Sequence, residues 1–251
     1  MRAIMLAAGL GWRLGAGEHQ PPKCLLNFDG QSLLERHLQA LAGLGVKQVH
    51  IGVGYRHQDI RAELRRLDLR MDVELIYNPD FQQGNIVTLD CLREALRGGG
   101  EILLMDADVL YHEDIMRRLC SSAHANSFLM DLDFEAGEEP VKLCVRDGRL
   151  QEFSKQIDPA ASYDLCGESV GFFKLCESMA MRLADKTAGY IERGDREAFY
   201  EAALRELLLE YPEQFGFEDI TGIPWIEIDF QEDIARAERE VMAHIRAREA
   251  A

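Results

Sequence analysis

The sequence predicts an α/β fold in which a mostly parallel central sheet lies between two layers of helices, with a smaller part built from a β-hairpin and helices. Apolar runs of strand length alternate with helical patterns through the first half of the chain, and this order produces parallel strands covered on both faces. After about residue 135 the pattern changes, and Asp147-Gly148 between two apolar runs predicts the hairpin. We therefore expect a Rossmann-like three-layer sandwich.

The chain of 251 residues is long enough for one large domain with a full core. We expect a single domain over 1–251, with one half at 1–135 and a second half at 136–251 that includes a C-terminal helix. No linker, repeat or low-complexity segment divides the sequence.

The first half contains short apolar runs, each followed by a helical pattern. The clearest helix start is Ser32-Leu33-Leu34-Glu35, a capping-box pattern with Ser32 as the N-cap and Glu35 reaching back. Leucines and His37 then follow at helical spacing. The predicted strands are 2–6, 48–53, 73–77, 102–105 and 127–132.

The second half begins with the two hairpin strands and ends with a charged helix. Apolar residues at helical spacing predict two further helices, and the C-terminal helix is expected from Glu232 and to fray after His244. The predicted strands are 141–145, 150–153, 169–174 and 225–228, and the two helices are 176–186 and 196–209.

Composition excludes several classes of protein. The formal net charge of −16 repels a polyanion, so nucleic acid is excluded as a partner. No apolar run is long enough to span a bilayer, and Met1-Arg2 leads directly into the first strand, so we expect no membrane partner, no signal peptide and a cytoplasmic location. The six cysteines form no Cys-x-x-Cys pair and are expected to be reduced core thiols, and the scattered histidines argue against a histidine-based metal site.

A glycine-rich loop follows the first strand and carries most of the functional information. Backbone N–H groups at short range, together with two cations, suit a polyphosphate. The dinucleotide fingerprint is absent because its third glycine comes one residue late, and no Gly-Lys-Ser/Thr triplet marks a P-loop. The residues concerned are Leu6, Ala7, Ala8, Gly9, Gly11, Gly15 and Gly17, with the cations Arg13 and Lys23.

This loop, with Pro22-Lys23-Cys24-Leu25, resembles the signature loop of nucleotidyltransferases that activate phosphorylated small molecules. That family includes sugar-1-phosphate nucleotidylyltransferases and, most similar to this chain, bacterial phosphocholine cytidylyltransferases. Trp12 departs from the pattern, because the family usually has a small hydroxyl residue there. The resemblance implies that Arg13 and Lys23 are catalytic. It also implies that the loop from Leu6 through Gly11 binds the nucleotide.

Two pairs of acids are the candidate Mg²⁺ ligands. Asp106 and Asp108 follow an apolar strand, and two acids at a strand's carboxyl end can hold Mg²⁺ through oxygen. Glu227 and Asp229 point to the same side of a late extended segment. The resemblance implies that Asp108 and one late acid bind the metal, with Asp229 preferred to Glu227. It also implies that Asp106 lies at the nucleotide. The alternative for Asp229 is helix capping.

A polar loop after the third strand predicts nucleobase recognition. Asn78, Gly84, Asn85 and Thr88 lie in or next to this loop, and amide and hydroxyl groups can read a base edge through paired donors and acceptors. The segment resembles a stretch of cytidylyltransferases, which favours cytidine. The alternative is a polar loop that only caps the following helix.

The acceptor site is predicted in the second half. By resemblance, Lys155 meets the acceptor phosphate, with Lys142 a weaker candidate, and Glu168 lies in an acceptor-lining turn. A quaternary ammonium is bound by aromatic faces and carboxylates, which Tyr190, Tyr200, Glu168 and Glu201 could supply. The alternative is that Phe199 and Tyr200 belong to the helix core.

Three functions follow from these residues. The first is transfer of CMP from CTP to phosphocholine or a related aminoalcohol phosphate, with Mg²⁺ as cofactor and release of pyrophosphate. The second is nucleotidyl transfer to a sugar-1-phosphate or inositol phosphate. The third is a non-catalytic nucleotide-binding regulator, which Arg13, Lys23, Asp108 and Asp229 argue against. The expected partners are a nucleoside triphosphate and a phosphorylated acceptor, and a homodimer is left open.

Overall fold

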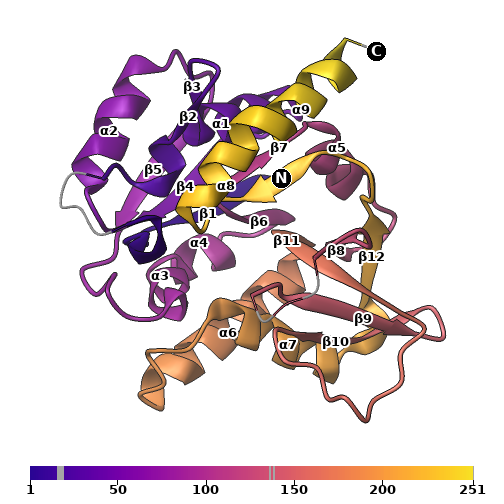
Figure 1. Ribbon diagram of the computed structural model, residues 1–251. Helices are drawn as coiled ribbons and strands as arrows, with labels where there is room; N and C mark the ends of the chain where they lie inside the picture. The colour runs from indigo at the N-terminus through magenta and orange to yellow at the C-terminus, as the bar shows by residue number, and fades with distance from the viewer. Residues whose placement is uncertain (16–19, 136, 138, 251) are drawn as a thin grey trace.

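The computed structural model describes residues 1–15, 20–135, 137 and 139–250, and their main feature is one sheet of nine strands. Seven strands follow the order β10-β9-β11-β6-β1-β4-β5, and β8 and β12 extend the sheet from β11 (Figure 1). The strands are β1 (Arg2–Ala7), β4 (Gln48–Val53), β5 (Asp72–Tyr77), β6 (Ile102–Asp106), β8 (Asn126–Asp131), β9 (Lys142–Arg146), β10 (Arg149–Ser154), β11 (Leu165–Leu175) and β12 (Phe215–Asp219).

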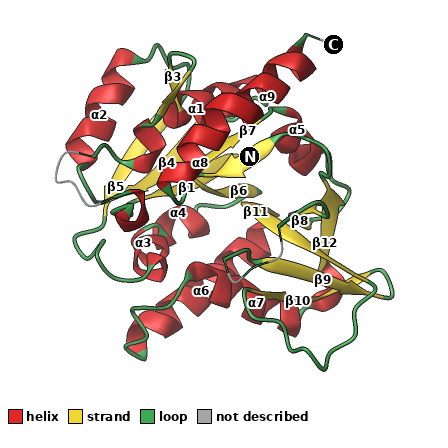
Figure 2. Cartoon of the chain, in the orientation of Figure 1, coloured by secondary structure: helices red, strands yellow, loops and turns green. Residues whose placement is uncertain are grey.

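Strands β5, β4, β1 and β6 are parallel, and helices cover both faces of this part of the sheet, although β5 at its edge is only partly buried. Successive residues of β1 point to opposite faces, so Ile4 joins one core cluster and Met5 the other. Helices α1, α2 and α5 cover the Met5 face, and α3, α4, α6 and α7 cover the Ile4 face (Figure 2). Their bounds are α1 (Leu33–Gly43), α2 (His57–Arg66), α3 (Asn85–Cys91), α4 (Arg93–Arg97), α5 (Asp114–Ser121), α6 (Glu177–Glu192) and α7 (Tyr200–Glu210). The predicted three-layer α/β fold is confirmed.

Strand β11 joins the second half of the chain to the parallel strands, because it pairs with β6, β8 and β9. The predicted hairpin is β9 and β10. Its turn residues Asp147 and Gly148 have φ of 51° and 70°, the left-handed conformation that a two-residue hairpin turn requires. The predicted N-cap is also present, since Ser32 Oγ accepts a hydrogen bond from the Glu35 amide at 3.1 Å. The Glu35 carboxylate pairs instead with Arg66.

Four short strands, β2 (Asn27–Phe28), β3 (Gln31–Ser32), β7 (Val109–Tyr111) and β12, were not predicted. Strand β12 lies at the sheet edge beside β8, and β7 pairs with β13 (Trp225–Glu227) in a separate two-stranded sheet. A further short hairpin pairs β2 with β3. Segments of two or three residues, such as β2, β3 and β7, are too short for periodicity to identify.

The C-terminal helix continues beyond the expected fraying point at His244. It consists of α8 (Gln231–Arg236), a π-helical segment (Ala237–Val241) and α9 (Met242–Glu249). The expectation of fraying is wrong because Met242 and Ile245 are buried in a third core cluster. Arg248 also pairs with Asp114 at 2.8 Å. None of the helices within the described residues is long and apolar enough to cross a membrane.

One cysteine pair differs from the expectation of reduced thiols. Cys144 on β9 and Cys166 on β11 are direct cross-strand partners with a Cα–Cα distance of 4.2 Å, and the structure joins them in a disulfide. Strand register brings the pair together, and sequence spacing alone does not show it. Cys24, Cys91, Cys120 and Cys176 are free, as expected.

Candidate active site

The candidate site lies where β1 and β6 end, and a short strand pairing brings the late acids to it. Asp106 is the last residue of β6, and Asp108 precedes β7. Because β13 runs antiparallel to β7 with Glu227 opposite Val109, the chain after β13 passes directly beside Asp108. The Ile228 amide donates to the Asp108 carbonyl oxygen at 3.0 Å. This backbone bond fixes Asp229 next to Asp108.

Three carboxylates converge at this point. Asp108, Glu227 and Asp229 each offer an oxygen atom, and these atoms lie within 4.8 Å of one another. The Glu227 side chain keeps contact with solvent through an adjoining cavity, but protein atoms surround it on most sides. Burial, together with the charges of Asp108 and Asp229, raises the pKa of Glu227 well above its ordinary value. Such a group of like charges is stabilised by a cation.

The Lys23 ammonium lies between two of these acids. Its Nζ is 3.0 Å from Asp108 Oδ2 and 2.6 Å from Asp229 Oδ1. Burial alone would lower the pKa of Lys23, but the two carboxylates outweigh it and raise the pKa above its ordinary value. Lys23 is therefore a fixed positive charge in the site.

The glycine loop packs against Lys23. Gly11 has φ of 64°, and a Cβ atom there would lie 3.3 Å from Lys23 Cγ. Glycine therefore supplies both the left-handed backbone and the space for the lysine stem. Leu6 and Ala8 are buried, Ala7 is half-buried and Gly9 is exposed. Gly17 lies outside the described residues.

Arg13 reaches the same group of acids. Its Nη1 is 2.8 Å from Glu139 Oε2 and 3.6 Å from Asp229 Oδ2. The guanidinium carbon also lies 5.4 Å from the centre of the Phe230 ring. The structure thus places both predicted catalytic cations beside Asp229.

Asp106 binds a tyrosine. Tyr200 Oη donates to Asp106 Oδ2 at 2.7 Å. Burial and the nearby charges of Glu201, Asp108 and Glu227 raise the pKa of Asp106 well above its ordinary value. A Cβ atom at Gly171 would lie 2.4 Å from the same Asp106 oxygen, so the glycine leaves room for the carboxylate.

The predicted base-reading side chains form hydrogen bonds within the protein. Asn78 is fully buried, and its Nδ2 donates to Thr88 Oγ1 at 3.0 Å. Asn85 Oδ1 accepts from the Tyr200 amide at 2.7 Å and so fixes the start of α7. A Cβ atom at Gly84 would lie 2.2 Å from the Ala198 carbonyl oxygen. These residues hold the loop against α7, and base recognition by them stays a prediction.

Comparison with known proteins identifies the family. Residues 3–159, more than half of the chain, match the family model of the MobA-like NTP transferase domain. The chain belongs to this family. It is 26% identical over 245 residues to the CMP-5'-(3-aminopropyl)phosphonate synthase of Streptomyces rubellomurinus, covering 95% of this chain but only 38% of that protein. It is 23% identical over 255 residues to the CTP:phosphoglutamine cytidylyltransferase of Campylobacter jejuni, covering 93% of this chain and 98% of that one.

A solved structure supports the fold. The inositol-1-phosphate CTP transferase from T. maritima superposes with a TM-score of 0.77 at 20% sequence identity, over 98% of this chain and 96% of that one. This similarity confirms the Rossmann-like fold of the transferase domain.

A cavity of about 1220 Å³ adjoins the acids of the transferase domain. Lys155 lies at this cavity, with its Nζ 3.2 Å from Glu139 Oε2. Lys142 donates instead to backbone oxygens, including that of Lys155 at 2.9 Å. The predicted site residues that line the cavity are Asp106, Lys155, Glu168, Tyr200, Glu201, Glu227 and Asp229.

Tyr190 does not reach this cavity. Its hydroxyl donates to Glu206 Oε1 at 2.7 Å, between α6 and α7. The prediction that Tyr190 lines the acceptor site is therefore wrong. Tyr200 does line the cavity, but its side chain is fully buried and its hydroxyl is bonded to Asp106. The residues proposed for an aromatic cage are thus not assembled into one.

Sequence reasoning missed three residues near the site. Glu139 binds both Arg13 and Lys155 from a loop with no recognisable pattern. Asp131 and Trp225 both line the cavity, and Trp225 Nε1 donates a hydrogen bond to Asp131 Oδ2 at 2.7 Å. Asp131 ends a strand as Asp106 does, and that signal could have found it.

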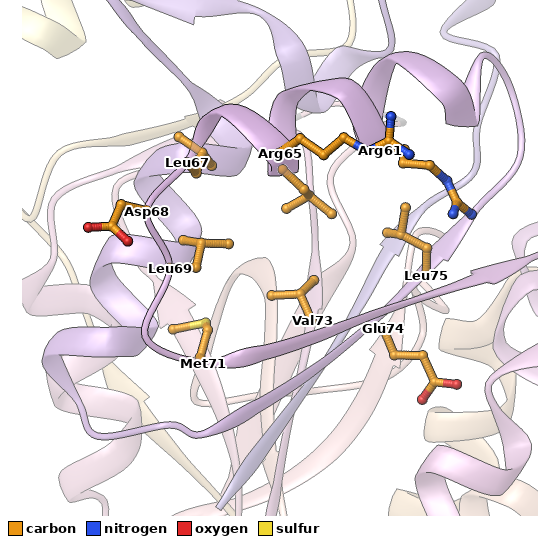
Figure 3. Close-up of a pocket in the computed structure, with 10 residues that line it drawn as sticks. Arg61, Arg65, Leu67, Asp68, Leu69, Met71, Val73, Glu74 and Leu75 are labelled. Atoms are coloured by element: carbon orange, nitrogen blue, oxygen red, sulfur yellow. The ribbon is translucent and has the colours of Figure 1, made fainter.

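A second cavity, of about 590 Å³, lies between α2 and β5 (Figure 3). Leu67, Leu69, Met71 and Val73 line it together with Arg61 and Arg65. None of the predicted site residues is among its lining residues.

Proposed function

We propose that this protein transfers CMP from CTP to a phosphorylated small molecule, phosphocholine or a related aminoalcohol phosphate, and releases pyrophosphate. The observation that carries the proposal is the convergence of Lys23, Arg13, Asp108 and Asp229 beside the glycine loop. The names of the Streptomyces and Campylobacter relatives both refer to cytidine nucleotides, which supports CTP as donor.

The residues at the site fit a divalent cation. Three carboxylate oxygens within 4.8 Å of one another form a donor set that Mg²⁺ prefers. The position of the Lys23 ammonium between two of these acids shows that the site favours positive charge. Asp108, Glu227 and Asp229 would hold Mg²⁺, which when bound neutralises charge on the transferred phosphate.

The protein's own groups then position and neutralise the reactants. A phosphate monoester is already an anion near neutral pH, so the attacking oxygen needs no general base. Arg13 and the backbone amides of the glycine loop bind the β- and γ-phosphates, and Lys23 stabilises the charge that develops during transfer. Lys155 anchors the acceptor phosphate from the side of the cavity.

Two alternatives make different predictions. A polyol acceptor, such as an inositol phosphate or sugar-1-phosphate, would donate hydroxyl hydrogen bonds to the carboxylates of the cavity. A non-catalytic nucleotide-binding regulator would bind nucleotide without forming pyrophosphate, and the retained cations and acids argue against it.

The test is a matrix of ATP, CTP, GTP, UTP and dTTP against phosphocholine, phosphoethanolamine, inositol-1-phosphate and glucose-1-phosphate, read by pyrophosphate release with Mg²⁺. We expect release with CTP and an aminoalcohol phosphate. Release only with a polyol phosphate would establish the first alternative. Nucleotide binding without release in any combination would overturn the proposed enzyme.

A further inference from the structure

Two acids face each other across neighbouring strands in the acceptor cavity. Asp131 on β8 and Glu168 on β11 are direct cross-strand partners, and both line the cavity. Like charges at directly opposite positions destabilise a sheet. The cavity therefore contains a pair of carboxylates that is unfavourable unless a positive group binds there.

Among the residues that the structure describes, no cation forms an ion pair with either acid. Asp131 accepts hydrogen bonds from Trp225 Nε1 at 2.7 Å and from the Asp133 amide at 2.9 Å, which are neutral donors. Within the described part of the chain, the Glu168 carboxylate has no hydrogen-bond or ion-pair partner. Lys142 is the partner of Glu168 on β9, but its ammonium donates to backbone oxygens.

The electrostatic surroundings of Glu168 agree with this geometry. Burial, followed by the charge of Asp131, raises the pKa of Glu168 to about 7, and Glu135 acts in the same direction. Arg236 and Lys142 are near enough to oppose the shift but do not cancel it. A cation bound between the carboxylates would favour the charged form of Glu168 and lower its pKa.

A third acid in the same cavity has one carboxylate oxygen without a partner. The Glu201 side chain is half-buried, and its Oε2, which is shielded from solvent, has no hydrogen-bond partner among the described residues. Glu201 lines the cavity at the start of α7, where Asn85 hydrogen-bonds its side chain. An unpaired buried acceptor costs free energy unless a ligand donates to it. Glu201 therefore adds one unsatisfied acceptor to the carboxylates that line the cavity.

We infer that Glu168 and Asp131 form the subsite for a primary ammonium group of the acceptor, so that the preferred substrate is a phosphorylated primary amine. This inference rests on the proposed function. A primary ammonium donates three hydrogen bonds to carboxylates, whereas a trimethylammonium has no N–H group and is bound through aromatic faces. Tyr190 lies outside the cavity and Tyr200 is fully buried, so the predicted aromatic cage is not formed.

The test compares wild type with Glu168→Gln and Asp131→Asn, which keep size and remove charge. Phosphoethanolamine, phosphocholine and inositol-1-phosphate are the acceptors. For wild type, we expect kcat/KM to be highest with phosphoethanolamine. In each variant we expect KM for phosphoethanolamine to rise about tenfold or more, while kcat/KM for inositol-1-phosphate changes less than about threefold.

A control and a stability measurement separate binding from folding. Glu218→Gln removes the same charge on β12 outside the cavity and should leave KM for phosphoethanolamine unchanged. Glu168→Gln should not lower Tm, because it relieves like-charge repulsion. Equal losses with phosphoethanolamine and inositol-1-phosphate, or a wild-type preference for phosphocholine, would overturn the subsite.

Failure of the subsite is distinguishable from failure of the proposed function. If no acceptor supports pyrophosphate release, the proposed function fails. Calorimetric titration of phosphoethanolamine, in the presence of Mg²⁺ and a non-hydrolysable CTP analogue, then decides the subsite. Weaker binding in Glu168→Gln than in wild type and Glu218→Gln supports it, and equal or absent binding in all three overturns it.

Discussion

The ammonium of Lys23 lies 2.6 Å from Asp229 Oδ1, although 206 positions separate the two residues in the chain. The lysine also contacts Asp108, 85 positions from it, so one side chain links the glycine loop to two of the three candidate metal ligands. Lys23 keeps its charge because the two acids outweigh the effect of burial on its pKa. A cation held in this way is positioned before substrates arrive, which is the arrangement that electrostatic catalysis requires.

The first prediction concerns the Lys23 ammonium. Lys23→Ala should lower kcat for pyrophosphate release by about 10² or more, as expected for the loss of an electrostatic transition-state contact. Steady-state kinetics with CTP and the best acceptor measure this. Lys47→Ala, a change at an exposed lysine outside the cavity, is the control and should retain normal kcat. A near-normal kcat in purified Lys23→Ala would exclude the catalytic role.

The second prediction concerns the metal. Asp108→Asn should abolish Mg²⁺-dependent pyrophosphate release, because it removes one charged oxygen ligand from a set of three. Titration of Mg²⁺ against initial rate measures the effect, and chelation of Mg²⁺ in wild type should give the same loss. Asp185→Asn, at an exposed site on α6, is a matched control. A variant whose rate still rises with Mg²⁺ as in wild type would place the ligand elsewhere.

These residues also show what the sequence could predict. The β-α alternation, the glycine loop and the two acid pairs were recognisable because each is a local pattern. Asp131 and Glu168 lie 37 positions apart, and only the register of β8 against β11 makes them neighbours. The role of Asn78 was equally hidden, because its amide is bonded to Thr88 inside the core. Local sequence carries residue type and spacing, whereas strand register and side-chain pairing depend on the whole sheet.

The third prediction concerns the glycine loop. Gly11→Ala should lower kcat/KM for CTP by about tenfold, because a left-handed backbone costs a residue with a Cβ atom about 1 kcal/mol or more and the new methyl group would crowd Lys23. Gly43→Ala is the control, since nothing lies within 4 Å of its Cβ position. If the two variants have equal kcat/KM, the packing of Gly11 on Lys23 does not matter for function.

The last prediction concerns His37, which supports the turn that carries Asp108. Its Nε2 lies 3.2 Å from the Ala107 carbonyl oxygen, which can only accept, so this nitrogen carries the proton. Its Nδ1 lies 3.2 Å from the Tyr111 hydroxyl and accepts from it. Burial lowers the pKa of His37 from 6.5 to about 4, although the bond to Ala107 opposes the shift. The folded protein therefore holds this ring neutral down to about pH 4.

Stability should consequently fall with acidification. The unfolded chain binds a proton at His37 below about pH 6.5 and the folded chain does not, so the contribution is complete above pH 6.5 and is lost between pH 6.5 and 4. Between pH 7 and pH 5 this residue should remove about 2 kcal/mol from the free energy of unfolding. Urea titrations at pH 7 and pH 5 measure the loss of unfolding free energy. In His37→Gln this loss should be about 2 kcal/mol smaller than in wild type. An identical pH dependence in variant and wild type would mean that His37 titrates normally in the folded protein.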